Sequence, residues 1–175
     1  MTTTESSPTR YYGKYRGTVI NVEDPMRMGR IMAEVPQVYG MLPSTWAMPC
    51  VSFAGIQSGE WTVPPLGAGV WMEFEQGDPN YPIWTGGYWG SAAEPPAMAQ
   101  LAPATVNHYV VQTTLQNTLQ ISDLPGPTGG ILLKTTTGAM ISINDIGITI
   151  SNGKGATIVM AGPAVTINAG ALTVI

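Results

Sequence analysis

The last 47 residues, 129–175, constrain the fold of this chain more than any other part. Short runs in which apolar residues alternate with polar or small ones are separated by turns rich in Gly, Asn and Pro. The successive runs are GGILLKTT, GAMISIND, GITISN, GATIVMAG, PAVTINAG and ALTVI. This weak internal repeat, with a period of about eight to nine residues, predicts short β-strands that follow one another directly.

Each of these strands has an apolar face that must be buried. We predict a core made of the side chains Ile141, Ile143, Ile146, Ile148, Ile150, Ile158, Val165 and Ile167. A parallel β-helix of one chain needs coils of roughly twenty residues and at least three repeats, so this region is too short for one. A single flat sheet would leave long strand edges almost without charge, since only Lys134, Asp145 and Lys154 are charged after Asp123.

The economical solution is therefore a homotrimer. Three identical chains wind around one axis as an intertwined triple-stranded β-helix, and each strand pairs with strands of its neighbours. We expect this needle to span residues 106–175. Asn144, Asn152 and Asn168 either hold an ion on its axis or, as their neighbouring glycines favour, belong to turns.

The aromatic residues mark a boundary between two halves. All five Trp, both Phe and six of the seven Tyr precede residue 91, and the only later aromatic is Tyr109. Residues 91–105 are rich in Ala and Pro, which predicts an extended linker, and residues 1–10 are expected to be a flexible tail. Between them, residues 11–90 contain five alternating segments and no convincing helix. The segments are 14–22, 30–36, 45–53, 70–76 and 81–89, and they suit a small barrel of the oligonucleotide/oligosaccharide-binding (OB) type. The fold class predicted is thus all-β.

Composition argues against several function classes. The net charge of −4 and the pI of about 4.8 do not suit a surface that neutralises phosphates, so we expect no nucleic-acid partner although many OB barrels bind single strands. The polar N-terminus and the lack of a long apolar window predict a soluble protein made in the cytosol. A trimeric fibre that binds a receptor or glycan is the strongest rival interpretation, but the second half has only one aromatic residue.

No residue is assigned a catalytic role, and no cofactor or metal is expected. Glu73 and Glu75 share a strand face near Asp78, as a glycosidase pair would, but we interpret them as a solvated outer face opposite Trp71 and Phe74. The five Trp are expected to pack in the core, and Cys50 is expected to be a small buried hydrophobe. The single histidine, His108, is expected at the junction of barrel and needle. Arg27 and Arg30 are expected to flank the first hairpin turn, and contact with a partner protein is the alternative role for these two arginines.

Two phrases of the barrel, GTVINVEDPMRMGRIMAEVP and PPLGAGVWMEFEQGDPNYPIWTGGYWG, resemble the central spike proteins of contractile phage tails (baseplate assembly protein V type) and the valine-glycine-repeat spikes of type VI secretion. The C-terminal repeat resembles their triple-stranded β-helix, so the resemblance covers residues 11–175. The barrel residues that carry it are Asp24, Pro25, Gly29, Arg30, Trp71, Phe74, Gly77, Asp78, Pro79 and Pro82.

The resemblance implies a mechanical function. The barrel would sit on a separate trimeric hub, and the needle would be driven through the target envelope, with transient membrane contact, when a sheath contracts. Some relatives bind iron through paired histidines, which His108 alone cannot do. Instead, a separate cap of the PAAR-repeat type is expected to dock on the apolar end, Ala171, Leu172, Thr173, Val174 and Ile175. Such spikes are assembled in the bacterial cytoplasm and occur in phages, secretion systems and extracellular injection particles alike.

Overall fold

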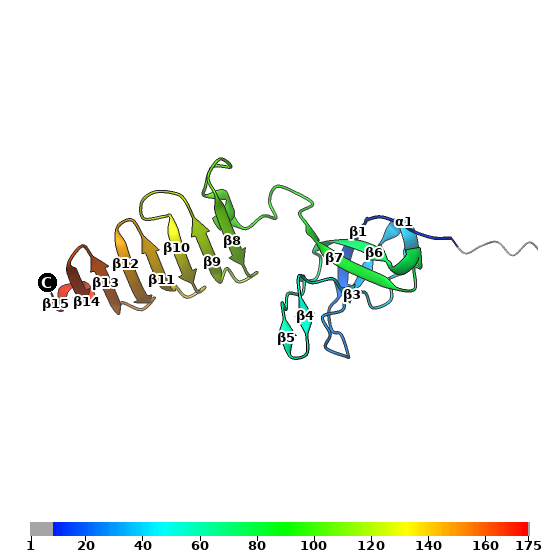
Figure 1. Cartoon of the computed structure of the whole chain (residues 1–175), viewed down its shortest axis with the longest axis horizontal. Helices are drawn as coiled ribbons and strands as arrows, with labels where there is room; N and C mark the ends of the chain where they lie inside the picture. The colour runs from blue at the N-terminus through cyan, green and yellow to red at the C-terminus, as the bar shows by residue number, and fades with distance from the viewer. Residues whose placement is uncertain (1–8, 175) are drawn as a thin grey trace, which may run out of the picture. The chain divides into compact units, whose positions relative to one another are not determined.

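A computed structural model describes residues 9–174 of the chain. The described chain divides between Glu94 and Pro95 into two compact units (Figure 1). The first unit has a five-stranded sheet in the order β2-β1-β6-β7-β3, and the second has an eight-stranded sheet. The prediction of an all-β chain is confirmed. The one α-helix among the described residues, α1 (Pro36–Tyr39), is a single turn that the sequence analysis did not predict, and Pro stands at its start, where proline suits a helix.

In the first unit the main strands are β1 (Tyr15–Asn21), β2 (Met32–Glu34), β3 (Met48–Pro49), β6 (Gly69–Phe74) and β7 (Pro82–Tyr88). β1 is antiparallel to both β2 and β6, β6 is antiparallel to β7, and β3 is parallel to β7. Ile31 and Ala47 exchange two backbone hydrogen bonds of 3.2 and 2.8 Å. Because Ile31 precedes β2 and Ala47 precedes β3, this bridge brings the two ends of the sheet order together and closes a small barrel.

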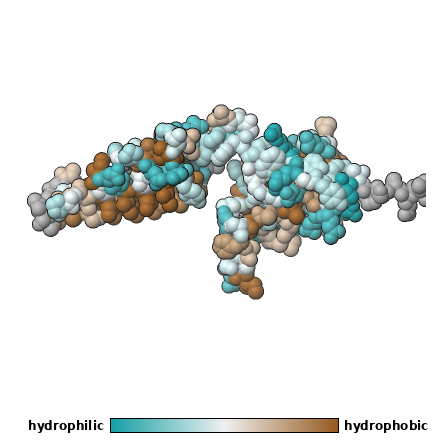
Figure 2. All heavy atoms as spheres, turned by 45° about the horizontal axis from the view of Figure 1, so that its top comes forward, coloured by the Kyte–Doolittle hydropathy of each residue, from teal (hydrophilic) through white to brown (hydrophobic). Residues whose placement is uncertain are grey.

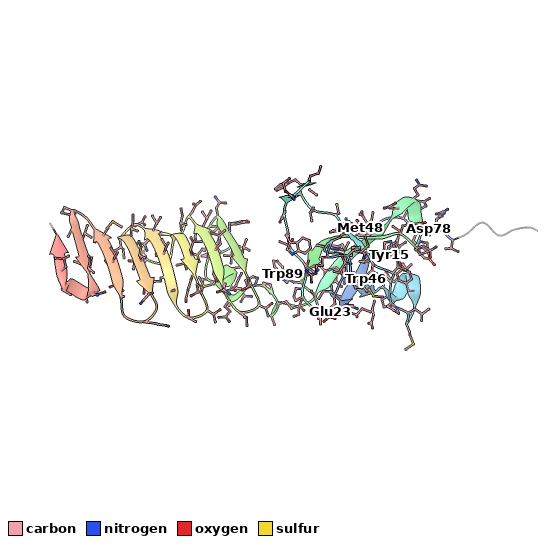
Figure 3. All side chains as sticks on the ribbon, turned by 90° about the horizontal axis from the view of Figure 1, so that it is seen from below. Tyr15, Glu23, Trp46, Met48, Asp78 and Trp89 are labelled. Carbon is pink, nitrogen blue, oxygen red and sulfur yellow. The ribbon has the colours of Figure 1, made fainter. Side chains whose placement is uncertain are left out.

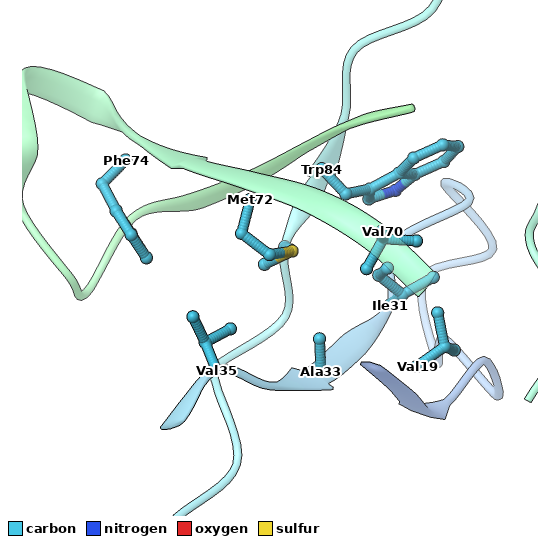
Figure 4. Packing of buried hydrophobic residues seen from close by; sticks show 9 residues of the cluster. Val19, Ile31, Ala33, Val35, Val70, Met72, Phe74 and Trp84 are labelled. Atoms are coloured by element: carbon cyan, nitrogen blue, oxygen red, sulfur yellow. The ribbon is translucent and has the colours of Figure 1, made fainter. Parts of the chain in front are cut away.

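Alternation along the strands fills the interior of the barrel. In β6, Val70, Met72 and Phe74 are buried while the residues between them are partly exposed. Figure 4 shows these side chains converging with those of the other strands. The complete core is Val19, Ile31, Ala33, Val35, Ala47, Val70, Met72, Phe74 and Trp84.

Two expectations for the barrel are wrong. Trp84 is the only one of the five tryptophans in this core, where its indole N–H donates to the Gly29 carbonyl at 3.1 Å, while Trp61 and Trp89 are mostly exposed. Cys50 is exposed rather than buried. Its amide donates to the carbonyl of Trp84 at 2.9 Å, and alternation from the buried Ala47 directs the side chain at position 50 outward.

The second unit is an antiparallel meander in which every strand pairs with the next. Its strands are β8 (His108–Gln112), β9 (Thr118–Ser122), β10 (Gly130–Lys134), β11 (Ala139–Asn144), β12 (Gly147–Asn152), β13 (Thr157–Ala161), β14 (Ala164–Ile167) and β15 (Leu172–Val174). Within one chain, these pairs join successive strands of the meander. Connections as short as Asp145-Ile146 and Gly162-Pro163 return the chain directly, and such tight reversals join antiparallel neighbours.

The asparagines of this unit belong to its turns. Asn144 Oδ1 accepts from the amide of Ile146 at 2.9 Å, and Asn152 Oδ1 accepts from the amides of Lys154 and Ala156 at 2.8 and 3.0 Å. Asn168 Oδ1 accepts from the amide of Thr157 at 3.0 Å. These three oxygens are therefore engaged by backbone amides, as the turn interpretation requires.

Candidate functional site

One face of the second unit carries two unbroken rows of large, mostly aliphatic side chains. Cross-strand registers place each member directly opposite the next, strand by strand from β8 to β15. The first row is Tyr109, Ile121, Ile131, Ile143, Ile148, Met160 and Val165, and the second is Val111, Leu119, Leu133, Ile141, Ile150, Ile158, Ile167 and Leu172. We call this surface the two-row face.

The two-row face is uncovered in the single chain. Ile131, Leu133, Ile141 and Ile143 are each between 41% and 47% exposed, so much of their apolar surface remains in contact with water. In Figure 2 the second unit shows a continuous hydrophobic band. Contiguous apolar patches of this kind mark interaction surfaces, because a monomer rarely leaves them in water.

The opposite face of the same sheet is more polar. Its central row, between the two apolar rows, consists of Val110, Gln120, Leu132, Ser142, Thr149, Val159 and Thr166. Near its start the chain itself covers this face: a 3-10 turn, η2 (Ala97–Gln100), contacts β8, and His108 Nε2 lies 2.9 Å from the Met98 carbonyl oxygen. His108 thus holds the segment that enters the second unit.

Seven of the eight predicted core residues lie in the two-row face. Ile146 does not: it lies in the turn between β11 and β12 and is 60% exposed, because the Asn144 side chain starts the turn before it. Tyr109, Leu119 and Ile121 were not predicted, because the core was sought only in the repeat after residue 131. Met160, which lies within that repeat, was also not predicted. Alternation in 108–122 was the signal that could have found the first three.

Simple geometry shows how copies of this sheet can bury the two-row face. A six-residue strand is about 20 Å long, so three such sheets arranged as a triangular prism leave about 6 Å from each sheet to the axis. Packed sheets lie about 10 Å apart, so the side chains of each sheet fill a depth of about 5 Å, close to the space available here. Two inward residues per strand from three chains therefore fill such a prism.

The first family motif of the barrel is the turn between β1 and β2. Asp24 accepts hydrogen bonds from the amides of Met26 and Met28 at 3.0 and 2.7 Å, and from Arg30 Nε and Nη2 at 3.0 and 2.6 Å. The Arg30 side chain, with help from these amides, holds the pKa of Asp24 far below its ordinary value, against an opposing effect of burial. Asp24 in turn raises the pKa of Arg30. Pro25 follows within this turn, and Gly29, with φ of +75°, completes it.

The second motif is the turn between β6 and β7. Gly77, with φ of +77°, accepts from the amide of Tyr11 through its carbonyl at 2.8 Å, and Asp78 forms an ion pair with Arg10 at 3.2 Å. The Asn80 amide lowers the pKa of Asp78. The Pro79 carbonyl accepts from the Tyr39 hydroxyl at 2.5 Å, and burial followed by the Asp78 charge raises the pKa of Tyr39 to about 12. Pro82 opens β7 and is buried. Through its contacts with Arg10 and Tyr11, this turn holds the segment before β1 against the barrel.

The outer face of β6 differs from the expectation. Trp71 lies on the same side as Glu73 and not opposite it, because both are odd-numbered positions of one strand, while Phe74 faces the core. The Arg16 guanidinium lies 5.7 Å from the Trp71 ring and 5.3 Å from the Tyr88 ring. Glu73 pairs with Lys14 at 2.7 Å, and Glu75 lies beyond the strand in the turn η1 (Glu75–Gly77). Asp78 and Trp89 lie at opposite ends of β7 (Figure 3).

The predicted cap-docking residues lie at the last strand. Ala171 is exposed, Leu172 is 54% exposed, and Leu172, Thr173 and Val174 form β15, the terminal strand of the sheet order. Ile175 lies outside the described residues. Within residues 9–174, no group of three or more His, Cys, Asp or Glu is arranged to hold a metal ion. No helix in the described part is long and apolar enough to cross a membrane.

Comparisons with known protein families agree with both units. The model of the phage baseplate V C-terminal trimerisation domain matches residues 108–173, which contain the two-row face. The model of the type VI secretion system/phage-baseplate injector OB domain matches residues 15–89. The chain belongs to the phage baseplate V spike family. No curated protein matched the chain.

Membership of this family explains the two-row face. The spike is a homotrimer, and its trimerisation domain is the part of the chain that leaves an apolar sheet uncovered. The first unit is an OB barrel, as predicted. Both families are structural components of a phage baseplate or related injection machine.

Proposed function

We propose that the trimer is the membrane-piercing central spike of a contractile injection machine. The barrels dock on a separate hub protein, and the needle, residues 106–175, crosses the envelope of the target cell when the sheath contracts. The trimer is assembled in the bacterial cytoplasm before it enters the particle. The barrel spans residues 11–90 and is joined to the needle by the linker 91–105.

The observation that carries this proposal is the uninterrupted two-row face. Eight strands spaced at about 4.8 Å make a sheet about 34 Å long, with backbone hydrogen bonds directed along that length. Closing three such sheets around one apolar core yields a rod that cannot bend without breaking main-chain hydrogen bonds. The second unit carries one aromatic side chain, Tyr109, and it lies in the two-row face, so a glycan-binding fibre receives no support from this surface.

The end of the needle is proposed to carry the cap. β15 is a terminal strand with an unpaired edge, and no charged side chain follows residue 162 to protect it. A separate cone-shaped protein of the PAAR-repeat type would cover Ala171–Ile175. A spike lacking residues 171–175 is expected to remain trimeric but to lose its cap in co-purification, and retention of the cap would contradict this part of the proposal.

Piercing is tested in particles. Deletion of residues 145–175 removes the four distal strands and leaves β8–β11, so we expect the particles to assemble and contract without permeabilising target cells. Dye entry into target cells measures the effect, and sheath contraction seen by electron microscopy confirms that the machine fired. A control deletion of residues 1–8 leaves both units and should preserve dye entry. Undiminished dye entry by the short spike would refute the piercing role.

A further inference from the structure

The barrel carries a second uncovered apolar feature, a small hairpin that we call the finger, residues 53–61. Its strands β4 (Ala54–Gly55) and β5 (Ser58–Gly59) pair only with each other. Ile56, in the turn between them, is 97% exposed, and Phe53 and Trp61 at its base are 61% and 66% exposed. Figure 1 shows the finger standing away from the barrel sheet, and Figure 2 shows hydrophobic atoms gathered at its end.

The finger has little to stabilise it in one chain. A two-stranded hairpin is at best marginally stable in water, and this one has only two residue pairs in its ladder. The Glu60 amide donates to the Phe53 carbonyl at 3.2 Å, and the Ser52 hydroxyl donates to the Glu60 carboxylate. An exposed isoleucine at the end of such a hairpin indicates that another surface covers it.

The same barrel has a recess that could receive an apolar side chain. A cavity of about 430 Å³ lies where the finger meets the barrel. The finger residues Gln57, Ser58 and Trp61 line it together with Met28, Val51 and Val63. Ile56 does not line this cavity. Ile56 therefore projects outside a recess that its own finger helps to form. A side chain that fills no recess of its own chain can enter the recess of a neighbour, as in a head-to-tail ring of identical subunits.

We propose that in the spike trimer Ile56 of each chain enters the recess of the next, so that the three fingers close a ring of OB barrels. This inference rests on the homotrimer that the trimerisation domain forms. It adds a second, separate interface to the one made by the two-row face.

The size of the patch favours a copy of the chain as its occupant. Burying Phe53, Ile56 and Trp61 would remove roughly 400 Å² of side-chain surface per chain, if aromatic side chains cover 150–250 Å² when fully buried. A free protein partner normally buries about 800 Å² on each side. A neighbour already held by the needle needs far less, because tethering raises its effective concentration to the millimolar range.

The charge of the finger argues against a lipid surface as the occupant. No Lys or Arg lies between residues 31 and 133, and the one charged side chain of the finger is Glu60. Segments that rest on anionic membranes combine apolar side chains with basic ones, and the finger has no basic side chain. An uncharged apolar patch suits a protein interface, whose centre is depleted in charge.

The experiment measures hydrogen exchange at residues 53–61 in the full-length trimer. It compares the natural chain with Ile56→Asp and with the matched control Met41→Asp, since Met41 is 99% exposed in the same barrel and far from the finger in sequence. We expect slow exchange in the natural chain and in Met41→Asp, and exchange at least about tenfold faster in Ile56→Asp. Light scattering on the same samples should give a trimer for all three, and Ile56→Ser replaces Ile56→Asp if the latter does not fold.

Fast exchange in the natural trimer, equal to that of Ile56→Asp, would overturn the inference. If vesicles of phosphatidylglycerol and phosphatidylcholine then slowed it, the occupant would be a membrane, which also overturns it. Neither readout involves piercing, so the inference and the proposed function can fail separately.

Discussion

At the scale of single residues, Asp24 organises the barrel more than its place in an exposed turn suggests. Its carboxylate accepts from three backbone amides and from the side chain of Arg30, which in turn lies over the Trp46 ring at 5.7 Å. Arg27 adopts a left-handed conformation within this turn, with φ of +52°. The resemblance identified Asp24 and Arg30 as motif residues, and the structure gives the physical reason: one carboxylate fixes the whole reversal.

Replacing Asp24 with Asn should lower the thermal stability of the barrel at pH 7, because Arg30 loses its charged partner. Unfolded aspartate has a pKa of about 3.9, and the folded pKa lies below it, so the stability from this pair is complete above about pH 4. It is lost as the pH falls below that value toward the folded pKa. Melting curves recorded by Trp fluorescence from pH 7 to pH 2 should show a smaller acid loss in Asp24→Asn than in the natural chain.

The control for this prediction is Glu23→Gln, which removes an exposed carboxylate from the same turn (Figure 3). It should leave both the stability at pH 7 and the acid response close to those of the natural chain. Equal acid losses in all three proteins would show that Asp24 contributes no linked stability.

At the scale of strands, alternation in the sequence predicted which residues share a face of a strand. It did not predict which strands pair or in what register. Ile141, Ile143, Ile148 and Ile150 could be assigned to one face because a strand repeats every second residue. The in-chain pairing, and with it the two rows, depends on turns such as the one that Asn144 starts, and the composition of a turn does not state which strand follows it. The same limit explains Trp71 and Cys50, whose sides are set by strand phase rather than by hydrophobicity.

Close approach of neighbouring strands makes Gly147 a sensitive position. Its φ is +150°, and a Cβ atom built there would lie 2.0 Å from the carbonyl oxygen of Met160. Gly147→Ala should therefore destabilise the needle by more than about 1 kcal/mol, since both the conformation and the space are unsuited to alanine. Gly155, with φ of +102° and nothing within 4 Å, is the matched control, and Gly155→Ala should cost only the conformational part. Denaturant melts of both variants measure the difference, and equal losses would show that the clash is relieved.

At the scale of the whole molecule, one of the two units cannot bury its apolar face within a single chain. The barrel has an enclosed core of its own, whereas the second unit leaves the two-row face exposed. The trimerisation domain brings together copies of the chain that carry the same apolar rows. The sequence predicted a homotrimer from this deficit, since an almost uncharged sheet of this length would aggregate as a monomer. It could not predict the finger, because its exposed residues form no repeat and resemble ordinary core residues.

Substitutions at two neighbouring positions of β12 test which face of the sheet the three chains bury. Ile150 lies in the two-row face and is 40% exposed in the single chain, while Thr149 lies on the opposite face. Aspartate at position 150 is placed against apolar side chains of two other copies, where an unpaired charge costs several kcal/mol. Aspartate at position 149 stays on the outer surface of the needle. Light scattering should therefore find Ile150→Asp as a monomer or weak oligomer and Thr149→Asp as a trimer. If instead Thr149→Asp dissociated and Ile150→Asp stayed trimeric, the polar face would be the one that the three chains bury.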